Sequence, residues 1–318
     1  MRRDAGTFNF EGAFRSGVGA GTFTFTPATG FPDEMVRRGF ARPTVSEQYL
    51  LAQQDIGFAF LDELNAERYA RPDLAQLVNA GRHGVDRAFV REIGALGYRL
   101  GTLDGLIRFR DHGVSAQYIR DLSAQGLSRL SADDLVRARD HGVSPEYVSA
   151  MRALGYKEAS SLDGLIAARD HGVSPEYVRE LKGLGYELTM ADLIAARDHG
   201  VSPEYVRALA ALGHQHLSLP ALIAARDHGV SPEYAAEVRN LGYTFTVTEL
   251  AQARDHGIGA RFLQQLGSGG TSLTMDQIAA LKDQGSYRLT RLQQADLKWY
   301  FHHHVKAFHQ WVRSLFPA

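Results

Sequence analysis

The chain of 318 residues contains no cysteine and only two tryptophans. The absence of cysteine excludes disulfides, thiolate metal sites and thiol nucleophiles, and it leaves the redox compartment open. No run of about 18 apolar residues occurs, so we expect no membrane-spanning helix. The sequence starts with alternating polar and aromatic residues instead of an apolar segment, so we expect no export signal at this end.

An excess of one charge is also missing. The sequence has 35 Lys+Arg against 36 Asp+Glu, with 44% hydrophobic and 22% charged residues, which is typical of a folded soluble protein. Balanced charge without a basic stripe argues against nucleic acid as the partner. We therefore expect a protein, peptide or small-molecule partner and predict no cofactor; the oligomeric state is left open.

A segment built around Asp-His-Gly recurs along most of the chain. Its histidines stand at positions 83 (in the variant Arg-His-Gly), 112, 141, 171, 199, 228 and 256, in steps of 28 to 30 residues. A repeat of this length is typical of a stacked array, in which each unit buries its apolar face against its neighbours.

Each unit carries start and stop signals for two short helices, which are clearest over residues 189–213. Thr189 is a predicted N-cap, and Gly200 is the predicted stop of the first helix. Ser202 is a second N-cap, followed by proline at the first helical position, and Gly213 ends the second helix. The unit is therefore predicted to be a helix pair.

Weaker copies extend the array at both ends. Ser46 and Leu50 reproduce the offsets of the N-cap and the core leucine, with Ile56 in the position of His. Thr274 begins a last unit in which glutamine replaces His. The core position of the first helix then occurs at 50, 77, 106, 135, 165, 193, 222, 250 and 278. We predict a mainly α fold, an α-solenoid of about nine two-helix repeats of ~29 residues over residues 31–289.

Two segments lie outside this array. Residues 1–30 contain two stretches of period-two alternation around the glycine-rich segment Ser16–Gly21, which predicts a short N-terminal β-hairpin with its turn at the glycines. No Gly-Lys-Ser/Thr follows, so a phosphate loop is disfavoured. The hairpin should pack on the first repeats or on another chain. Residues 290–318 have apolar residues at helical spacing, which predicts an amphipathic C-terminal helix that caps the array.

The repeated histidines and tyrosines are the candidate ligand-binding residues. Each His also falls in the last turn of a first helix, where capping and hydrogen bonds along the stack are the alternative role. The Arg and Asp beside each His are expected to pair within or between repeats. The candidates are His112, His141, His171, His199, His228, Tyr147, Tyr177, Tyr205 and Tyr234.

No catalytic or metal-ligating residue is predicted. Regular rows place every His and Glu in an equivalent environment, and neither Gly-x-Ser-x-Gly nor His-Glu-x-x-His occurs. The cluster His302–His304 with His309 breaks the repeat, but consecutive helical residues point in different directions, so metal binding there would need other partners.

The unit Asp-His-Gly-Val-Ser-Pro-Glu-Tyr-Val, followed by Leu-Gly-Tyr, resembles repeats in the C-terminal extracytoplasmic tails of bacterial BlaR1-like (M56 family) sensor peptidases and related repeat proteins. The resemblance covers roughly residues 6–285. The zinc motif and membrane helices of the peptidase are missing from this sequence, so no catalytic residue carries over. The resemblance implies a sensing or binding module. It places the chain outside the cytoplasm if the sequence is part of a sensor, whereas a complete chain would be cytoplasmic.

These observations favour a non-enzymatic binding scaffold that recognises a protein, peptide or medium-sized ligand on the concave face of the solenoid. The first alternative is a hydrolase with His and Asp or Glu lining the groove, which a deep pocket with convergent groups would favour. The second alternative is sequestration of a small molecule by a wrapping solenoid.

Overall fold

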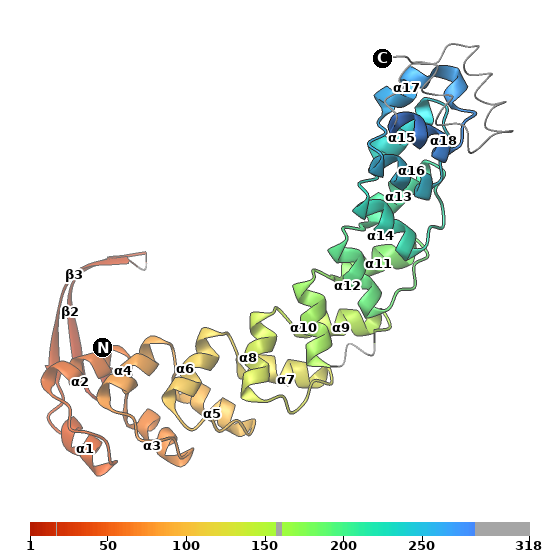
Figure 1. Cartoon of the computed structure of the whole chain (residues 1–318). Coiled ribbons are helices and arrows are strands. Elements are labelled where there is room, and N and C mark those ends of the chain that lie inside the picture. Colours follow the sequence, from red (N-terminus) through yellow and green to blue (C-terminus); the bar gives the residue numbers. More distant parts are fainter. Residues whose placement is uncertain (17, 157–160, 284–318) are drawn as a thin grey trace. The chain divides into compact units, whose positions relative to one another are not determined.

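The computed structural model describes residues 1–16, 18–156 and 161–283. In this part of the chain the fold is mainly helical, with 18 helices and one three-stranded antiparallel sheet (Figure 1), which confirms the predicted class of helical-repeat solenoid. The fold divides into two compact units, Met1–Arg169 (unit 1) and Asp170–Ala318 (unit 2). None of the described helices is long and apolar enough to cross a membrane. The C-terminal helix predicted at 290–318 and the cluster His302–His304 lie outside the described residues.

Unit 1 contains three strands and the first part of the array. The strands are β1 (Arg2–Arg3), β2 (Gly6–Arg15) and β3 (Val18–Pro27), and the short helix α1 (Phe31–Arg37) follows them. The first helices of the repeats are α2 (Val45–Gln53), α4 (Leu74–Arg82), α6 (Leu103–Asp111), α8 (Ala132–Asp140) and α10 (Leu162–Asp170). The second helices are α3 (Phe58–Ala66), α5 (Arg87–Ala95), α7 (Ala116–Ala124) and α9 (Pro145–Ala153).

Unit 2 continues the same alternation. Its first helices are α12 (Met190–Asp198), α14 (Leu219–Asp227), α16 (Val247–Asp255) and α18 (Met275–Asp283). Its second helices are α11 (Pro175–Gly183), α13 (Pro203–Ala211), α15 (Pro232–Asn240) and α17 (Ala260–Gly270). The described residues thus contain nine first helices, the number that the sequence predicts.

The caps and stops act where the sequence places them. The Thr189 hydroxyl accepts a hydrogen bond from the Asp192 amide at 3.2 Å and begins α12, and the Ser202 hydroxyl accepts one from the Tyr205 amide at 3.1 Å and begins α13. Gly200 has a φ of +68°, the left-handed geometry that ends a helix at glycine. Most helices therefore span nine residues, a length that is marginal alone and needs tertiary packing.

Neighbouring repeats stack in two rows within each unit. The first helices of neighbouring repeats contact each other, for example α4 with α6 and α14 with α16. The second helices do the same, for example α5 with α7 and α13 with α15. Leu193, Val201 and Leu209 are at most 1% exposed and place the apolar face of one repeat in the shared core. This burial supplies the stability that an isolated pair lacks.

The first repeat corrects the predicted alignment. The N-cap of α2 is Thr44 and not Ser46, and Asp55 has the positive φ that glycine has in later repeats. Ile56 then takes the buried position of Val and not that of His, and Gln48 takes the position of the core leucine. The alignment from Leu50 failed because a polar residue occupies the core position of this repeat.

The strands form the predicted hairpin and pack on α2. Gln48, only 3% exposed, donates from Nε2 to the Ala28 carbonyl at 2.8 Å and to the Ala5 carbonyl at 3.2 Å. The buried Phe8 packs against Tyr49 with ring centroids 5.8 Å apart. These contacts confirm that the hairpin rests on the first repeat. The sequence analysis did not foresee β1, which pairs Arg2 and Arg3 with the start of β2.

The glycine-rich segment is mostly strand and not turn. Arg15 pairs with Val18 and Gly12 pairs with Gly21, so Val18–Gly21 belong to β3. A Cβ on Gly12 or on Gly21 would collide with a carbonyl oxygen of the opposite strand. Glycine is therefore needed here because the two backbones approach each other closely, and the prediction of a turn over the whole segment was wrong.

Candidate functional site

The predicted histidines occupy the C-caps of first helices, and six of the repeated histidines bond to the Asp of the following repeat. Nδ1 lies 2.6 to 3.1 Å from the carboxylate oxygen in every pair. The pairs are His83–Asp111 and His112–Asp140 in unit 1, and His171–Asp198, His199–Asp227, His228–Asp255 and His256–Asp283 in unit 2. His141 also C-caps its helix, α8. The side chains are about 34 to 44% exposed, so this row of pairs lies at the surface.

The predicted tyrosines are buried between repeats. Tyr147, Tyr177, Tyr205 and Tyr234 are only 5 to 7% exposed. The hydroxyl of Tyr205 donates to the Val230 carbonyl in the next repeat at 2.9 Å, and Tyr177 and Tyr234 make the equivalent bond. Burial raises the pKa of all four tyrosines to about 12. Little of these rings is left for a ligand to contact.

The Arg before an Asp-His-Gly covers the aromatic ring of the preceding repeat, which is Phe89 for Arg110 and a tyrosine for the five later arginines. The guanidinium of Arg226 lies 4.9 Å from the Tyr205 ring centroid, and four other Arg–Tyr pairs span 4.5 to 5.1 Å. In unit 1, Arg139 Nε also donates to the Gly113 carbonyl at 2.7 Å. Arg and Asp therefore both reach the preceding repeat, so the Arg-Asp-His-Gly motif mainly joins neighbouring layers.

A His–carboxylate pair can orient an imidazole, but acyl transfer also needs a nucleophile and oxyanion donors. The pairs here are equivalent along a row, and each carboxylate belongs to a different repeat. No group of three or more His, Asp or Glu within the described residues is placed to hold a metal ion. The functional candidates must therefore be sought where the repeats differ from one another.

The first such place is a groove across α12 and α14 in unit 2. It has a volume of about 540 Å³, and Ala195, Pro220, Ile223 and Ala224 are among the residues that line it. Leu188 and Leu219 extend the apolar wall, and Asp192, Asp227 and His228 form a polar rim. The groove is thus apolar at its base and acidic at its edge.

The same positions carry ion pairs in unit 1. Arg137 of α8, equivalent to Ala195, lies 2.7 Å from Asp163 of α10, which is equivalent to Pro220. Arg108 and Asp133 pair in the same way. The residue after the core leucine is buried in unit 1, as in Val136, whereas Ile223 of unit 2 is only half-buried. Replacement of the pairs by alanine and proline therefore opens this surface.

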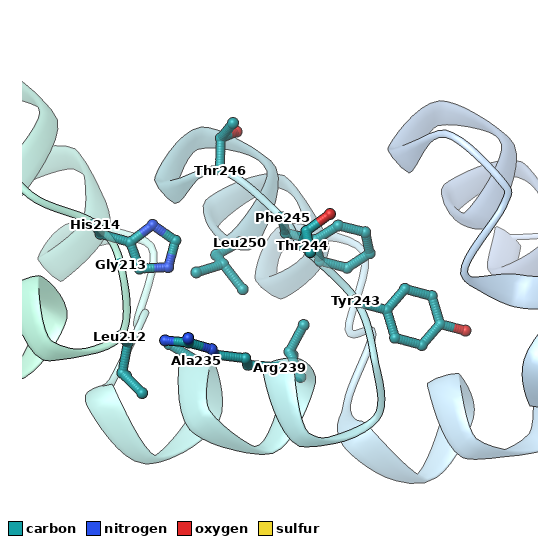
Figure 2. A pocket seen from close by; sticks show the side chains of 11 residues that line it. Leu212, Gly213, His214, Ala235, Arg239, Tyr243, Thr244, Phe245, Thr246 and Leu250 are labelled. Carbon is teal, nitrogen blue, oxygen red and sulfur yellow. The ribbon is translucent and has the colours of Figure 1, made fainter.

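The second irregular place is the loop at His214, which follows α13. Most other repeats have tyrosine in this position, with Leu127 as an exception, and Tyr186 donates its hydroxyl to the Leu217 carbonyl at 2.8 Å. A cavity of about 360 Å³ lies on one side of His214 and a second of about 390 Å³ on the other. Figure 2 shows the first cavity, with His214 and Arg239 on one side of it and Phe245 across from them.

Of the predicted candidates His228 lines the groove. The two openings themselves were not predicted, although the substitutions are visible in the sequence. Alanine replaces arginine at 195 and histidine replaces tyrosine at 214, each at a fixed offset in the repeat. The residues that the repeats share hold the layers together, whereas the openings arise where the shared residue is missing.

No protein-family model matches the sequence, and no curated protein is significantly similar to it. The resemblance to the tails of M56-family sensors therefore stays a prediction.

Proposed function

We propose that the chain is a non-enzymatic binding scaffold that holds a peptide segment of a partner protein in the α12–α14 groove of unit 2. The sequence pattern predicts a ligand on the concave face in general, and the groove is one part of unit 2. The observation that carries it is the loss of the Arg–Asp pair at Ala195 and Pro220, which leaves Ile223 half-buried and a groove of about 540 Å³ open. Such a surface suits apolar side chains better than it suits catalysis.

The rim selects the charge of the partner. Asp192 and Asp227 border the groove, and no Lys or Arg is among the residues that line it. A basic residue next to the apolar side chains of the peptide would face these carboxylates and be attracted to them. An acidic residue of the peptide at the same place would be repelled. We therefore infer a peptide with two or three small or medium apolar side chains flanked by Lys or Arg.

The test restores the ion pair of unit 1. A displayed peptide library is selected on the full chain, and the affinity of a selected peptide is measured by fluorescence polarisation for the wild type and for Ala195→Arg/Pro220→Asp. The double variant copies Arg137 and Asp163, so it should fold normally and bind at least about tenfold more weakly. Gln252→Arg is the control for the new arginine, because it places the same side chain at the equivalent position of α16, where Gln252 already bonds to Asp276.

Two results decide the matter. Selected peptides that are apolar and basic, and that are lost only in the double variant, support the proposal. Peptides that bind wild type and double variant equally, or a selection without apolar and basic residues, would refute it. Raised salt should weaken binding modestly, because Asp192 is only half-buried and Asp227 is exposed.

A further inference from the structure

The cavity at His214 arises from a missing side chain. In two other repeats the residue after Leu-Gly is a tyrosine whose hydroxyl reaches the carbonyl that precedes a first-helix N-cap, 31 or 32 residues further along the chain. Tyr98 donates to the Leu130 carbonyl at 2.8 Å, and Tyr186 does the same to Leu217. The equivalent acceptor for residue 214 is the carbonyl of Phe245, which precedes the N-cap Thr246. Histidine is shorter than tyrosine, so space remains where the phenol would lie.

The lining of this space combines one cation with an apolar wall. Eleven residues line it, and Arg239 is the one among them with a full formal charge. Phe245, Leu250 and Val238 supply apolar surface, and Thr244 is an exposed hydroxyl at the rim. No carboxylate is part of the lining, so the charge of Arg239 faces the cavity without an acidic neighbour in it.

Arg239 differs from its counterparts in other repeats. Arg152 occupies the same helix position in α9 and donates to the Gln125 carbonyl, and Lys182 in α11 pairs with Glu187 at 2.9 Å. The Arg239 guanidinium makes no hydrogen bond or ion pair with any residue of the described part of the chain. The repeat thus offers a guanidinium next to a cavity, without the carbonyl bond that Arg152 makes in α9.

We propose that this cavity binds a monoanion, a carboxylate attached to an aromatic or branched aliphatic group. The ligand carboxylate pairs with the Arg239 guanidinium, whose planar N–H groups match the two oxygens of a carboxylate. The apolar group of the ligand lies against Phe245 and Leu250. A volume of about 360 Å³ is within the range of small-molecule sites.

One net positive charge fits a carboxylate better than a doubly charged phosphate. Burial, and then the nearby charge of Arg239, lower the pKa of His214, so its imidazole is neutral at neutral pH. The imidazole can then accept or donate a hydrogen bond without adding a second charge. The ligand can be a free acid or the C-terminus of a peptide, since both present the same carboxylate.

The site is separate from the α12–α14 groove, because no residue lines both. The inference therefore goes beyond the proposed function, and the two can fail independently. Ala195→Arg/Pro220→Asp should weaken peptide binding in the groove and leave acid binding unchanged, whereas Arg239→Gln should weaken acid binding and leave peptide binding unchanged.

The experiment is calorimetric titration of the full chain with N-acetylphenylalanine and with the neutral N-acetylphenylalaninamide as its matched control. A pentapeptide that ends in phenylalanine, as free acid and as amide, distinguishes the peptide source, and inorganic phosphate tests the charge. We expect both acids to bind at least about tenfold more tightly than their amides, since a charge-assisted pair is lost in the amide.

Three variants locate the binding. Arg239→Gln should weaken the acid about tenfold or more, whereas Arg152→Gln, which removes arginine from the same helix position in unit 1, should leave it unchanged. His214→Tyr should abolish binding and raise the melting temperature, because the phenol refills the cavity and reaches the Phe245 carbonyl. Equal binding of acid and amide, tighter binding of phosphate, no binding of any acid at millimolar concentration, or full binding by Arg239→Gln would each overturn the proposal.

Discussion

Replacing the glycine of Asp-His-Gly by alanine adds a single Cβ atom, and the effect of this atom on stability tests the contact between neighbouring repeats. Gly200 and Gly257 both end a first helix in unit 2, with φ of +68° and +63°. A Cβ at Gly200 would lie 2.9 Å from Nη2 of Arg226, whereas a Cβ at Gly257 would meet nothing within 4 Å. Alanine at the two positions therefore has the same dihedral cost but a different effect on the next repeat.

The expected magnitudes follow from these distances. A left-handed alanine costs about 1 to 2 kcal/mol at either position. Gly200→Ala also displaces Arg226 from the Tyr205 ring, a cation–π contact that contributes about 0.5 to 1 kcal/mol at a partly exposed site. We expect a loss of about 1.5 to 3 kcal/mol for Gly200→Ala and of about 1 to 2 kcal/mol for Gly257→Ala. The change in the unfolded chain is the same for both and cancels in the comparison.

The assay is urea unfolding followed by circular dichroism, repeated in the Arg226→Ala background. The double-mutant cycle isolates the contact between layers, because the excess cost of Gly200→Ala should disappear when Arg226 is absent. Equal losses for the two glycines in the wild-type background would refute the role of Arg226, and no loss at either would refute the left-handed stop itself.

Three further outcomes test the other contacts. His199→Gln should cost less than about 1 kcal/mol in urea unfolding, because its pair with the next carboxylate is largely exposed; a large loss would show that the ring does more than join layers. Tyr205→Phe should cost about 1 kcal/mol by losing a buried hydrogen bond. Folding raises the pKa of Tyr205 to about 12 from 10. The stability conferred by the neutral phenol is therefore complete below pH 10 and falls as the pH rises toward 12. Unfolding curves measured over a series of pH values should show a smaller fall in stability for Tyr205→Phe than for the wild type. Gln48→Met should cost about 1 kcal/mol and speed hydrogen exchange in the hairpin while the exchange of unit 2 stays constant.

The helical array could be predicted because its signals are local. The N-cap Thr189, the left-handed Gly200 and the N-cap Ser202 act within a few residues of themselves, so one sequence window contains both the signal and its effect. The period then repeats this information many times, which is why the number of first helices agreed with the structure.

The misassigned features depend on residues far apart in the chain. Gln48 stands in a core position because its amide reaches Ala5, 43 residues earlier, and no local pattern shows that partner. Tyr205 was a candidate for ligand binding, but its hydroxyl is bonded to a carbonyl 25 residues ahead. The openings at Ala195 and His214 are likewise a relation between two repeats, so the substitutions were visible but their effect was not.

The joining of layers by Arg, Asp, Tyr and His has a consequence for how such a chain can change in length. Each repeat contributes Tyr and His toward the following repeat and Arg and Asp toward the preceding one. Duplication or excision of one whole period within unit 2 therefore creates a junction with the same four partners as before. An insertion or deletion of any other number of residues would move these partners away from each other. Sequence should therefore be gained or lost here in whole repeats.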